Sequence, residues 1–568
     1  MLVAGVDVGN STTELAVASL DPGGVPEWRL VLRAPTTGLK GSVECAAGVS
    51  ELLGRAERRL GERPHRLLLS ELHPVEAGLV ELGRMEELDL ARTAIARPAS
   101  ATPSGEGVAV GVLRPLAALA GESGAEPVLA VVAGADFEQA AAILGAARSR
   151  GWKITGVLVE GDDAVLIGNR FDRTMPIVDE VTDAARLPFG ALAAIEVAPA
   201  GGAVEQLSDP LRTAALLGLP PDEARAARHA SRAVAGHRAA VVVRGERTTS
   251  PPPQCAEVAP IRLLSPGGQE LPFDERADPP APGSVRAIRG AAGDRDRLLD
   301  VAWCPLPSPP DDPGFSRRLA SRRAVAVALL AEADASGLVE ALAGEAAGGV
   351  EVVGRESEAA VLGASTTPGA GHAPFVLDIG GGTVDLHREH DTGRQMVVTA
   401  GAGDLVTRIC AGLLACDQPL AERAKRVRSA WVETPFTIHH EDGTRAFLGE
   451  PAPSQAVARL CALDGRELRP LPVPLAPEVW RGLRRAAKRD VIGRNVRRAL
   501  AAAGGVPRGE LVTLVGGSAC DPEVVDAVAV ELTDLDVAVA RGDVLGRHGP
   551  RAAVAVGLVL AYAGRDSR

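Results

Sequence analysis

The chain has 568 residues, more than one hydrophobic core usually serves, so we expect two to four domains. Its formal net charge of −12 argues against nucleic acid or an anionic membrane as the main partner, because either would need a basic face. The 7 scattered cysteines indicate reduced thiols of a cytoplasmic protein. The longest uncharged apolar stretch, residues 552–563, is shorter than the roughly 18 residues that suggest a membrane span.

The first 90 residues begin with three short β-type runs, at 2–6, 14–19 and 28–33, separated by turn residues. This spacing predicts a three-stranded antiparallel meander. A helical spacing over 41–60 and an apolar strand over 66–70 follow. Such an order of elements is typical of the start of a ribonuclease-H-like half domain.

From about residue 91 the sequence changes to short strands among prolines and glycines, and we expect an inserted, swivelling-type α/β domain over 91–250. Its expected elements are a helix at 137–150 and strands at 108–113, 128–132, 154–160, 164–167 and 239–244. A proline-rich connector over 251–315 should be irregular, with some strands.

The last segment, 316–568, is expected to complete the core. Its pattern predicts a helix over 316–343, a strand over 350–353, a basic amphipathic helix or pair of helices over 477–504, and a closing helix over 550–563.

The first strand ends in a turn that combines a carboxylate with hydroxyl and amide side chains: Asp7, Gly9, Asn10, Ser11, Thr12 and Thr13. Backbone N–H groups and hydroxyls in such a turn suit a β- or γ-phosphate. The alternative is a hairpin turn that needs Asp, Gly and Asn only for its geometry.

A second turn of this kind follows the apolar run 375–377 and contains Asp378, Gly380, Gly381, Gly382 and Thr383. A structural turn explains one glycine, not three in succession, so the backbone is expected to approach a ligand here. If the two turns face each other they form a clamp, with N–H groups directed at phosphate oxygens and Asp7 and Asp378 holding a hydrated divalent cation.

Two more segments carry candidate residues. Glu356 and Glu358 lie between a strand and a helix, where either could orient a water for phosphoanhydride hydrolysis or simply complement the helix dipole. Gly516, Gly517 and Ser518 follow an apolar strand, where the diglycine would let a planar base or ribose lie on the backbone and Ser518 could cap the next helix. A plain strand-to-helix turn is the alternative.

The order of these pieces resembles the actin, sugar-kinase and heat-shock-70 ATPase superfamily, in which nucleotide lies between two lobes. The resemblance implies an α/β fold with a duplicated ribonuclease-H-like core, here carrying an inserted α/β domain. It also implies that the segment 420–426 forms an adenine wall, with Ala421, Glu422, Arg423 and Ala424 at the nucleoside beside Gly516 and Gly517. By the same resemblance Asn10, Ser11 and Thr12 contact phosphate.

A narrower resemblance covers almost the whole chain. The segments 4–14, 36–41, 176–180, 192–198, 362–369 and 400–404 look like the large subunit of diol and glycerol dehydratase-reactivating factors, chaperone-like ATPases that act on adenosylcobalamin-dependent dehydratases. This implies a hetero-oligomer with a small, dehydratase-β-like subunit whose ATP-dependent exchange lets damaged cobalamin leave. It also implies that Thr102, Asp162 and Asp179 hold Mg²⁺ or Ca²⁺ in the inserted domain, for which hard oxygen donors are suited; loop capping is the alternative.

We therefore expect a slow ATPase, with Mg²⁺ as its metal, whose affinity for a small subunit and a dehydratase depends on whether ATP or ADP is bound. Asp7 and Asp378 would organise the cation and Glu356 would position water. Two rivals remain from the same superfamily: a small-molecule kinase, which would need an Asp base facing an acceptor pocket, and an actin-like filament protein.

Overall fold

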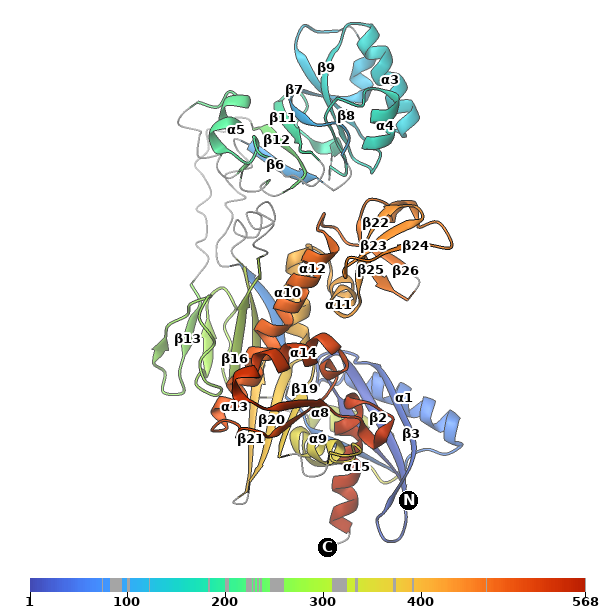
Figure 1. Ribbon diagram of the computed structural model, residues 1–568, viewed down its shortest axis with the longest axis vertical. Coiled ribbons are helices and arrows are strands. Elements are labelled where there is room, and N and C mark those ends of the chain that lie inside the picture. Colours follow the sequence, from blue (N-terminus) through green and yellow to red (C-terminus); the bar gives the residue numbers. More distant parts are fainter. Residues whose placement is uncertain are drawn as a thin grey trace.

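The computed structural model describes residues 1–566 except 74, 82–93, 100–102, 122, 182–183, 200–203, 221–226, 228–229, 232–233, 235–236, 246–259, 309–323, 333–335, 371–373, 391–392 and 466. Figure 1 shows the described elements in three levels, with the inserted domain at one end and both chain termini at the other. Among the described residues, no helix has the length and apolar character needed to cross a bilayer.

The described strands form six sheets, written here in spatial order. Two sheets of the core have the orders β18 (Val350–Arg355), β4 (Arg66–Glu71), β1 (Leu2–Val8), β2 (Thr12–Leu20), β3 (Pro26–Pro35) and β21 (Gly393–Ala400), β20 (Thr383–His390), β19 (Phe375–Ile379), β27 (Leu511–Val515), β28 (Ala538–Arg541). The seven-stranded sheet has the order β10 (Ile177–Val178), β9 (Lys153–Val159), β8 (Pro127–Val132), β7 (Gly107–Pro115), β11 (Leu192–Val197), β12 (Ala239–Arg244), β6 (Ala94–Ala99). The other three sheets have the orders β14 (Glu270–Leu271), β13 (Arg262–Leu264), β15 (Ala287–Arg289); β16 (Leu298–Pro305), β17 (Ala324–Ala331), β5 (Val75–Glu81); and β24 (Arg445–Phe447), β23 (Thr437–His440), β22 (Ser429–Thr434), β25 (Leu460–Asp464), β26 (Glu467–Pro470).

The α-helices of the described part are α1 (Cys45–Leu60), α3 (Phe137–Ser149), α4 (Ala164–Arg170), α5 (Pro210–Leu216), α8 (Ser336–Leu342), α9 (Glu356–Ala364), α10 (Gly403–Leu414), α11 (Gln418–Arg426), α12 (Pro477–Lys488), α13 (Arg494–Ala502), α14 (Pro522–Glu531) and α15 (Ala553–Asp566). A π-helical turn, η5 (Arg489–Gly493), joins α12 to α13. The segment 477–504 is therefore the expected pair of helices.

Two five-stranded sheets share one topology, which confirms the duplicated ribonuclease-H-like core. In each, a central strand (β1 or β19) pairs antiparallel with the strand that follows it and parallel with β4 or β27, and a fifth parallel strand lies beyond. The register is also repeated, since Asp7 lies opposite Glu14 and Asp378 lies opposite Asp385. Both central strands are buried along their whole length.

Helices α9 and α15 join the two half domains. Their buried small side chains form one apolar cluster with residues of both sheets, including Val3 and Ala16 from the first and Val376 and Val515 from the second. Because α15 closes the chain but packs on the sheet that begins it, the first and last segments are fixed to each other. This arrangement places the turns after β1 and β19 at the same cleft.

The inserted domain contains the seven-stranded sheet from β6 to β12, in keeping with the expected α/β insertion. The expected strand over 164–167 is wrong, because Ala164–Arg170 is the helix α4. Its buried residues, Ala164, Ile167 and Gly168, follow the i, i+3, i+4 spacing of a helix face. A run of four apolar residues is too short for periodicity to separate the two structures.

The single helix expected over 316–343 is also wrong within the described part, which contains strand β17 and the short helix α8. Alanine and leucine favour helices, but β17 pairs with β16 on one side and β5 on the other and buries most of its residues. Sheet pairing on both sides outweighs the weak intrinsic preference.

The proline-rich stretch is more regular than expected. Its described part contributes β13, β14, β15 and β16, and Trp303 of β16 is buried against Phe273. Through β16 this stretch belongs to the same sheet as β5 and β17, so residues on both sides of the inserted domain build one unit.

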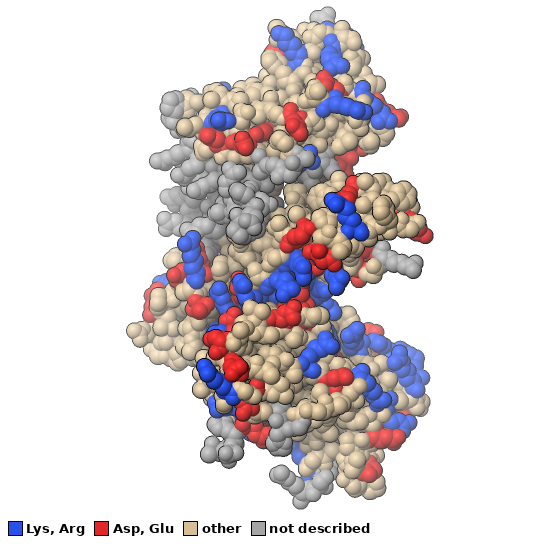
Figure 2. All heavy atoms as spheres, viewed as in Figure 1, with Lys and Arg blue, Asp and Glu red and all other residues tan. Residues whose placement is uncertain are grey.

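Two ion pairs of Arg459 link the inserted domain to the sheet β22–β26. Arg459, which immediately precedes β25, lies 3.1 Å from Asp162 Oδ2 and 3.5 Å from Glu180 Oε1. Glu180 has a φ of 49°, an unusual backbone conformation for a residue other than glycine. On the face seen in Figure 2, acidic and basic side chains are interspersed and do not gather into one basic area.

Candidate active site

The turns after β1 and β19 lie against each other. Both are closed by the same hydrogen bond, from Gly9 N to Thr12 O and from Gly380 N to Thr383 O, each 3.0 Å long. A Cβ built on Gly382 would lie 2.8 Å from Asn10 Nδ2, so the two turns are in contact. Two segments far apart in the sequence are thus brought to one site.

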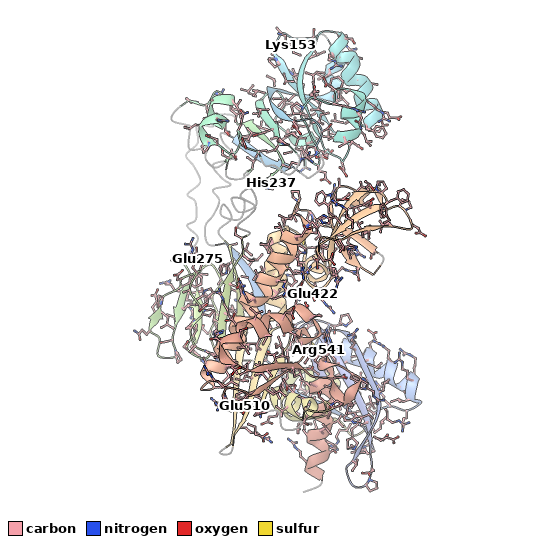
Figure 3. The ribbon with its side chains drawn as sticks, in the orientation of Figure 1. Lys153, His237, Glu275, Glu422, Glu510 and Arg541 are labelled. Atoms are coloured by element: carbon pink, nitrogen blue, oxygen red, sulfur yellow. The ribbon has the colours of Figure 1, made fainter. Side chains whose placement is uncertain are left out.

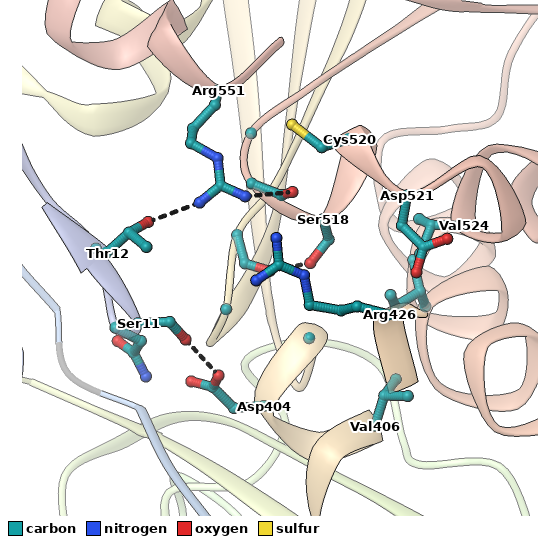
Figure 4. A pocket seen from close by; sticks show the side chains of 18 of the residues that line it. Ser11, Thr12, Asp404, Val406, Arg426, Ser518, Cys520, Asp521, Val524 and Arg551 are labelled. Carbon is teal, nitrogen blue, oxygen red and sulfur yellow. Dashed lines mark hydrogen bonds between the residues drawn. The ribbon is translucent and has the colours of Figure 1, made fainter. Parts of the chain in front are cut away.

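The two turns open on a cavity of about 220 Å³ (Figure 4). The residues proposed from sequence that line it are Asp7, Gly9, Asn10, Ser11, Thr12, Glu356, Asp378, Gly380, Gly381, Glu422, Gly516, Gly517 and Ser518. Lys425 and Arg426, which belong to the expected adenine wall, line it too. Lining residues that sequence reasoning did not propose are Glu14, Gly403, Asp404, Val406, Lys488, Ile492, Cys520, Asp521, Pro522, Val524 and Arg551.

Six proposed residues lie beside this cavity without lining it: Thr13, Gly382, Thr383, Ala421, Arg423 and Ala424. Helix α11 explains three of them, because Ala421 and Ala424 are buried in the core and Arg423 pairs with Asp464 at 2.5 Å. The face of α11 that meets the cavity carries Glu422, Lys425 and Arg426, at i, i+3 and i+4. That spacing was available in the sequence.

Two aspartates form the floor of the site. Asp7 and Asp378 are buried, and burial, together with the nearby carboxylate of Glu356, raises the pKa of both well above the usual value. Asp7 Oδ1 has no hydrogen-bond partner among the described residues. A buried, unpartnered carboxylate oxygen is costly unless a cation satisfies it, so this pair fits a divalent metal with oxygen ligands.

Glu356 is the first residue of α9 and is held by Lys40, whose Nζ donates a 2.6 Å hydrogen bond to Glu356 Oε2. Burial alone would lower the pKa of Lys40, but the carboxylates of Glu356 and Asp7 outweigh it and raise the pKa. Glu358, the alternative from sequence, lines neither this cavity nor its neighbour.

A second cavity, of about 310 Å³, lies behind Glu356 and is lined by Lys40, Thr383 and Asp385 among others. Burial, followed by the charge of Glu356, raises the pKa of Asp385 to about 7. Asp385 is the counterpart of Glu14 in the repeated register, and sequence reasoning did not single it out.

The diglycine lines the cavity and also lies close to two protein side chains. Gly516 has a φ of 88°, and a Cβ there would lie 2.1 Å from Asp378 Oδ1. A Cβ on Gly517 would lie 3.5 Å from Arg551 Cζ. Gly516 therefore leaves the room that the carboxylate of Asp378 needs, whereas a Cβ on Gly517 would only make an ordinary contact with Arg551. Ser518 does not cap the next helix: its hydroxyl donates to Gly380 O at 2.7 Å, and Asp521 caps α14.

Hydroxyls of the first turn already have partners across the cleft (Figure 4). Ser11 Oγ donates to Asp404 Oδ1 at 2.7 Å, and Thr12 Oγ1 donates to Glu14 and accepts from Arg551, both at 3.0 Å. A phosphate bound by these hydroxyls would have to replace these contacts.

Charge at the cavity favours a metal-bound anion. Among the described residues, 7 carboxylates and 4 cationic side chains line it, a formal excess of three negative charges. A bare polyphosphate would be repelled, whereas its complex with a divalent cation would reduce the repulsion. The chemistry of the lining therefore suits a metal–nucleotide complex.

The three residues proposed for a metal in the inserted domain are only partly described, since Thr102 lies outside the described residues. Asp179 directly follows β10, and Asp162 follows β9, its parallel neighbour. The backbone N–H of Glu180 donates to Gly161 O at 3.0 Å, which brings the two segments together. In the described part of the chain, no group of three or more His, Cys, Asp or Glu side chains could hold a metal ion.

The fold and the cleft together define an actin-like and heat-shock-70-like, ATPase-like domain. Two family models match the chain: the diol dehydratase reactivase ATPase-like domain over residues 313–562 and the DD-reactivating factor swiveling domain over residues 93–249. The chain belongs to the family of dehydratase-reactivating factor large subunits.

Relatives and solved structures agree with this assignment. The propanediol dehydratase-reactivating factor large subunit of Citrobacter freundii is 33% identical over 99% of this chain and 98% of its own length. The diol dehydratase-reactivating factor large subunit of Klebsiella michiganensis is also 33% identical, with the same coverage. The structure of diol dehydratase-reactivating factor in nucleotide-free form matches this chain with a TM-score of 0.58 at 31% identity, and the match covers 99% of this chain and 100% of the other. The structure of a glycerol dehydratase reactivase matches with a TM-score of 0.56 at 29% identity and the same coverage.

Proposed function

We propose that this protein hydrolyses ATP in the cleft between its two half domains, with Mg²⁺ as the metal. The observation that carries the proposal is the convergence of Asp7, Asp378 and Glu356 on one cavity beside two glycine-rich turns. Such turns direct backbone N–H groups at phosphate oxygens.

Each group of this site has a distinct task. When bound, the cation would neutralise charge on the phosphates and line up the scissile bond. Glu356 accepts a hydrogen bond from the attacking water and orients it, and the hydrogen bond from Lys40 fixes the direction of the Glu356 side chain. The turn N–H groups then stabilise charge on the phosphoryl oxygens as the transition state forms.

We further propose that hydrolysis is coupled to reactivation of an adenosylcobalamin-dependent diol or glycerol dehydratase. Support comes from the relatives, which are named as large subunits of dehydratase-reactivating factors. A small, dehydratase-β-like subunit would bind this chain in a hetero-oligomer, and its exchange would let damaged cobalamin leave the dehydratase. ATP and ADP must then favour different partner-binding conformations, since equal affinity would shift nothing.

The test is a reconstitution with inactivated dehydratase, the small subunit, ATP, Mg²⁺ and fresh adenosylcobalamin. Dehydratase activity should return with the wild-type chain and fail to return with Glu356→Gln. ATP turnover without an added acceptor separates this function from a small-molecule kinase. Nucleotide-dependent pelleting would indicate a filament protein instead.

For the inserted domain we propose a Mg²⁺ or Ca²⁺ site that includes Thr102, Asp162 and Asp179. The proximity of the segments carrying the two aspartates supports it, as does the choice of hard oxygen donors. Calorimetric titration with Ca²⁺ should show binding that Asp179→Asn abolishes and that Glu138→Gln, an exposed change in the same domain, leaves intact. Equal binding by Asp179→Asn would refute the site.

A further inference from the structure

Three carbonyl groups of the turn after β19 are bonded to one short segment, which joins β21 to α10. Gly401 N donates to Gly382 O and Asp404 N to Gly381 O, both at 2.8 Å, and Gly403 N donates to Gly380 O at 3.3 Å. The C=O and N–H of a trans peptide unit point in opposite directions, so the same bonds also fix where the N–H groups of these peptide units point. The segment 401–404 therefore sets the peptide planes of the turn.

A buried asparagine holds the beginning of this segment. Asn495, on α13, donates from Nδ2 to Ala400 O at 2.7 Å and to Gly401 O at 2.5 Å. The φ of Gly401 is 89°, and a Cβ there would lie 3.2 Å from Asn495 Nδ2, so this close approach requires a glycine. One amide group thus bonds two successive carbonyls, which fixes the direction in which the chain leaves β21.

Two charged side chains fix the amide of Asn495. Arg498 Nη1 donates to Asn495 Oδ1 at 2.7 Å, and Arg498 Nη2 pairs with Asp300 Oδ1 at 3.0 Å. Asp300 is buried on β16, and its Oδ2 accepts a 2.8 Å hydrogen bond from Ala400 N. The backbone on both sides of residue 400 is therefore bonded to one closed network of side chains. A buried polar network whose members are all satisfied is rigid.

The sheet that carries Asp300 also contacts the turn after β1. Strands β16, β17 and β5 form this sheet, and Asn10 Nδ2 donates to the carbonyl oxygen of Val75, the first residue of β5, at 3.0 Å. A Cβ on Gly382 would lie 2.8 Å from the Cβ of Val75. Both turns therefore pack on one sheet, and the network of Asp300 and Asn495 attaches the turn after β19 to it.

We propose that Asn495 is a positioning residue for ATP hydrolysis, which together with Asp300 and Arg498 holds the N–H groups of the turn after β19 where charge develops on the transferred phosphoryl group. This inference deepens the proposed ATPase function and rests on it. The three side chains are described and lie outside the lining of the cavity, so they act through the segment 401–404. Donors held ready for the transition state lower the barrier of the chemical step more than they strengthen binding of the substrate.

The experiment compares Asn495→Asp with the wild-type chain. The variant keeps the shape of the side chain and an oxygen for Arg498, but it has no N–H for the two carbonyls. We expect kcat for ATP hydrolysis to fall by about tenfold, the effect of one lost hydrogen bond, while KM changes by less than about twofold. Calorimetry should show unchanged binding of ADP with Mg²⁺. ADP with Mg²⁺ and aluminium fluoride, which imitates the phosphoryl group in transfer, should bind about tenfold more weakly.

Two controls separate positioning from loss of stability. Val496→Ala removes buried apolar atoms at the next residue of α13, so it should lower the melting temperature without lowering kcat. Arg541→Gln, at an exposed arginine on β28 in the sheet that contains β19 (Figure 3), should match the wild type in both measurements.

Arg498→Lys covers the case in which Asn495→Asp does not fold, because it keeps a positive charge beside Asp300. An ammonium group lacks the fixed fork that holds Asp300 and Asn495 together, so kcat should still fall, by about threefold, with ADP binding unchanged. Equal losses of kcat and ADP binding, or an unchanged kcat in a folded variant, would overturn the inference and leave the ATPase proposal in place. A wild-type chain that hydrolyses no ATP would overturn both.

Discussion

Lys40 and Glu356 form a hydrogen-bonded ion pair of 2.6 Å between residues that are 316 positions apart in the chain. The lysine precedes α1 and the glutamate begins α9, so the pair joins these two segments at the wall of the cavity. It also separates the two cavities, since Glu356 lines both and Lys40 lines only the second.

Replacing Glu356 by Gln should lower kcat for ATP hydrolysis by about 10² to 10⁴, the range for loss of a positioned general base. Nucleotide binding should change little, because an amide fills the same space. Steady-state kinetics and calorimetry measure the two effects. Glu358→Gln, two residues further along α9, is the control. An equal loss of kcat in that variant would refute the proposal that Glu356 positions the attacking water.

The pKa of Asp385, raised to about 7, predicts how stability depends on pH in metal-free buffer. The folded protein holds a proton on this carboxyl that the unfolded chain, with a pKa near 3.8, releases. The stabilising effect is therefore complete below pH 3.8 and is lost as pH rises through 7. Urea unfolding should show that Asp385→Asn is less sensitive than the wild type to a change from pH 6 to pH 8. The opposite slope would contradict the prediction.

Gly516→Ala should greatly weaken nucleotide binding, because the added methyl group would collide with Asp378 Oδ1 and displace the carboxylate that we propose holds the metal. We expect at least a tenfold rise in the dissociation constant of ADP with Mg²⁺, measured by calorimetry. Gly505→Ala is a matched control: its φ is 86°, close to the 88° of Gly516, but nothing lies within 4 Å of the new Cβ. It should cost about 1 kcal/mol of stability and leave binding intact. Similar binding losses in both variants would attribute the effect to backbone strain.

Arg459→Ala should strengthen Ca²⁺ binding in the inserted domain by about tenfold, since it removes the ion pair with Asp162 and with it a competing positive charge. It should also speed backbone hydrogen exchange on both sides of the contact, at 160–163 and in β25. Arg469→Ala, in the same sheet but paired with Glu467, is the control. If Ca²⁺ binds equally to both variants and the wild type, Arg459 does not compete for the site.

The two turns after β1 and β19 could be predicted from sequence because each is a local pattern, an apolar strand followed by an acid and several glycines or hydroxyls. The overall fold followed from their order. Lys40 and Arg551 could not be found in this way, since each is one basic residue whose meaning depends on a partner hundreds of positions away. The errors at 164–167 and 316–343 have another cause: short or alanine-rich apolar runs fit a helix and a strand equally well until their neighbours are known.

The repeated register of the core, with Asp7 opposite Glu14 and Asp378 opposite Asp385, gives the cleft an approximate twofold symmetry. If only the backbone is considered, a triphosphate would find the same arrangement of N–H groups in either orientation. Two basic residues break this equivalence, because Arg551 lies beside Glu14 whereas Lys40 lies with Glu356 at the cavity of Asp385. For a nucleotide bound as proposed, the direction in which it lies would thus be set by side chains that differ between the two half domains.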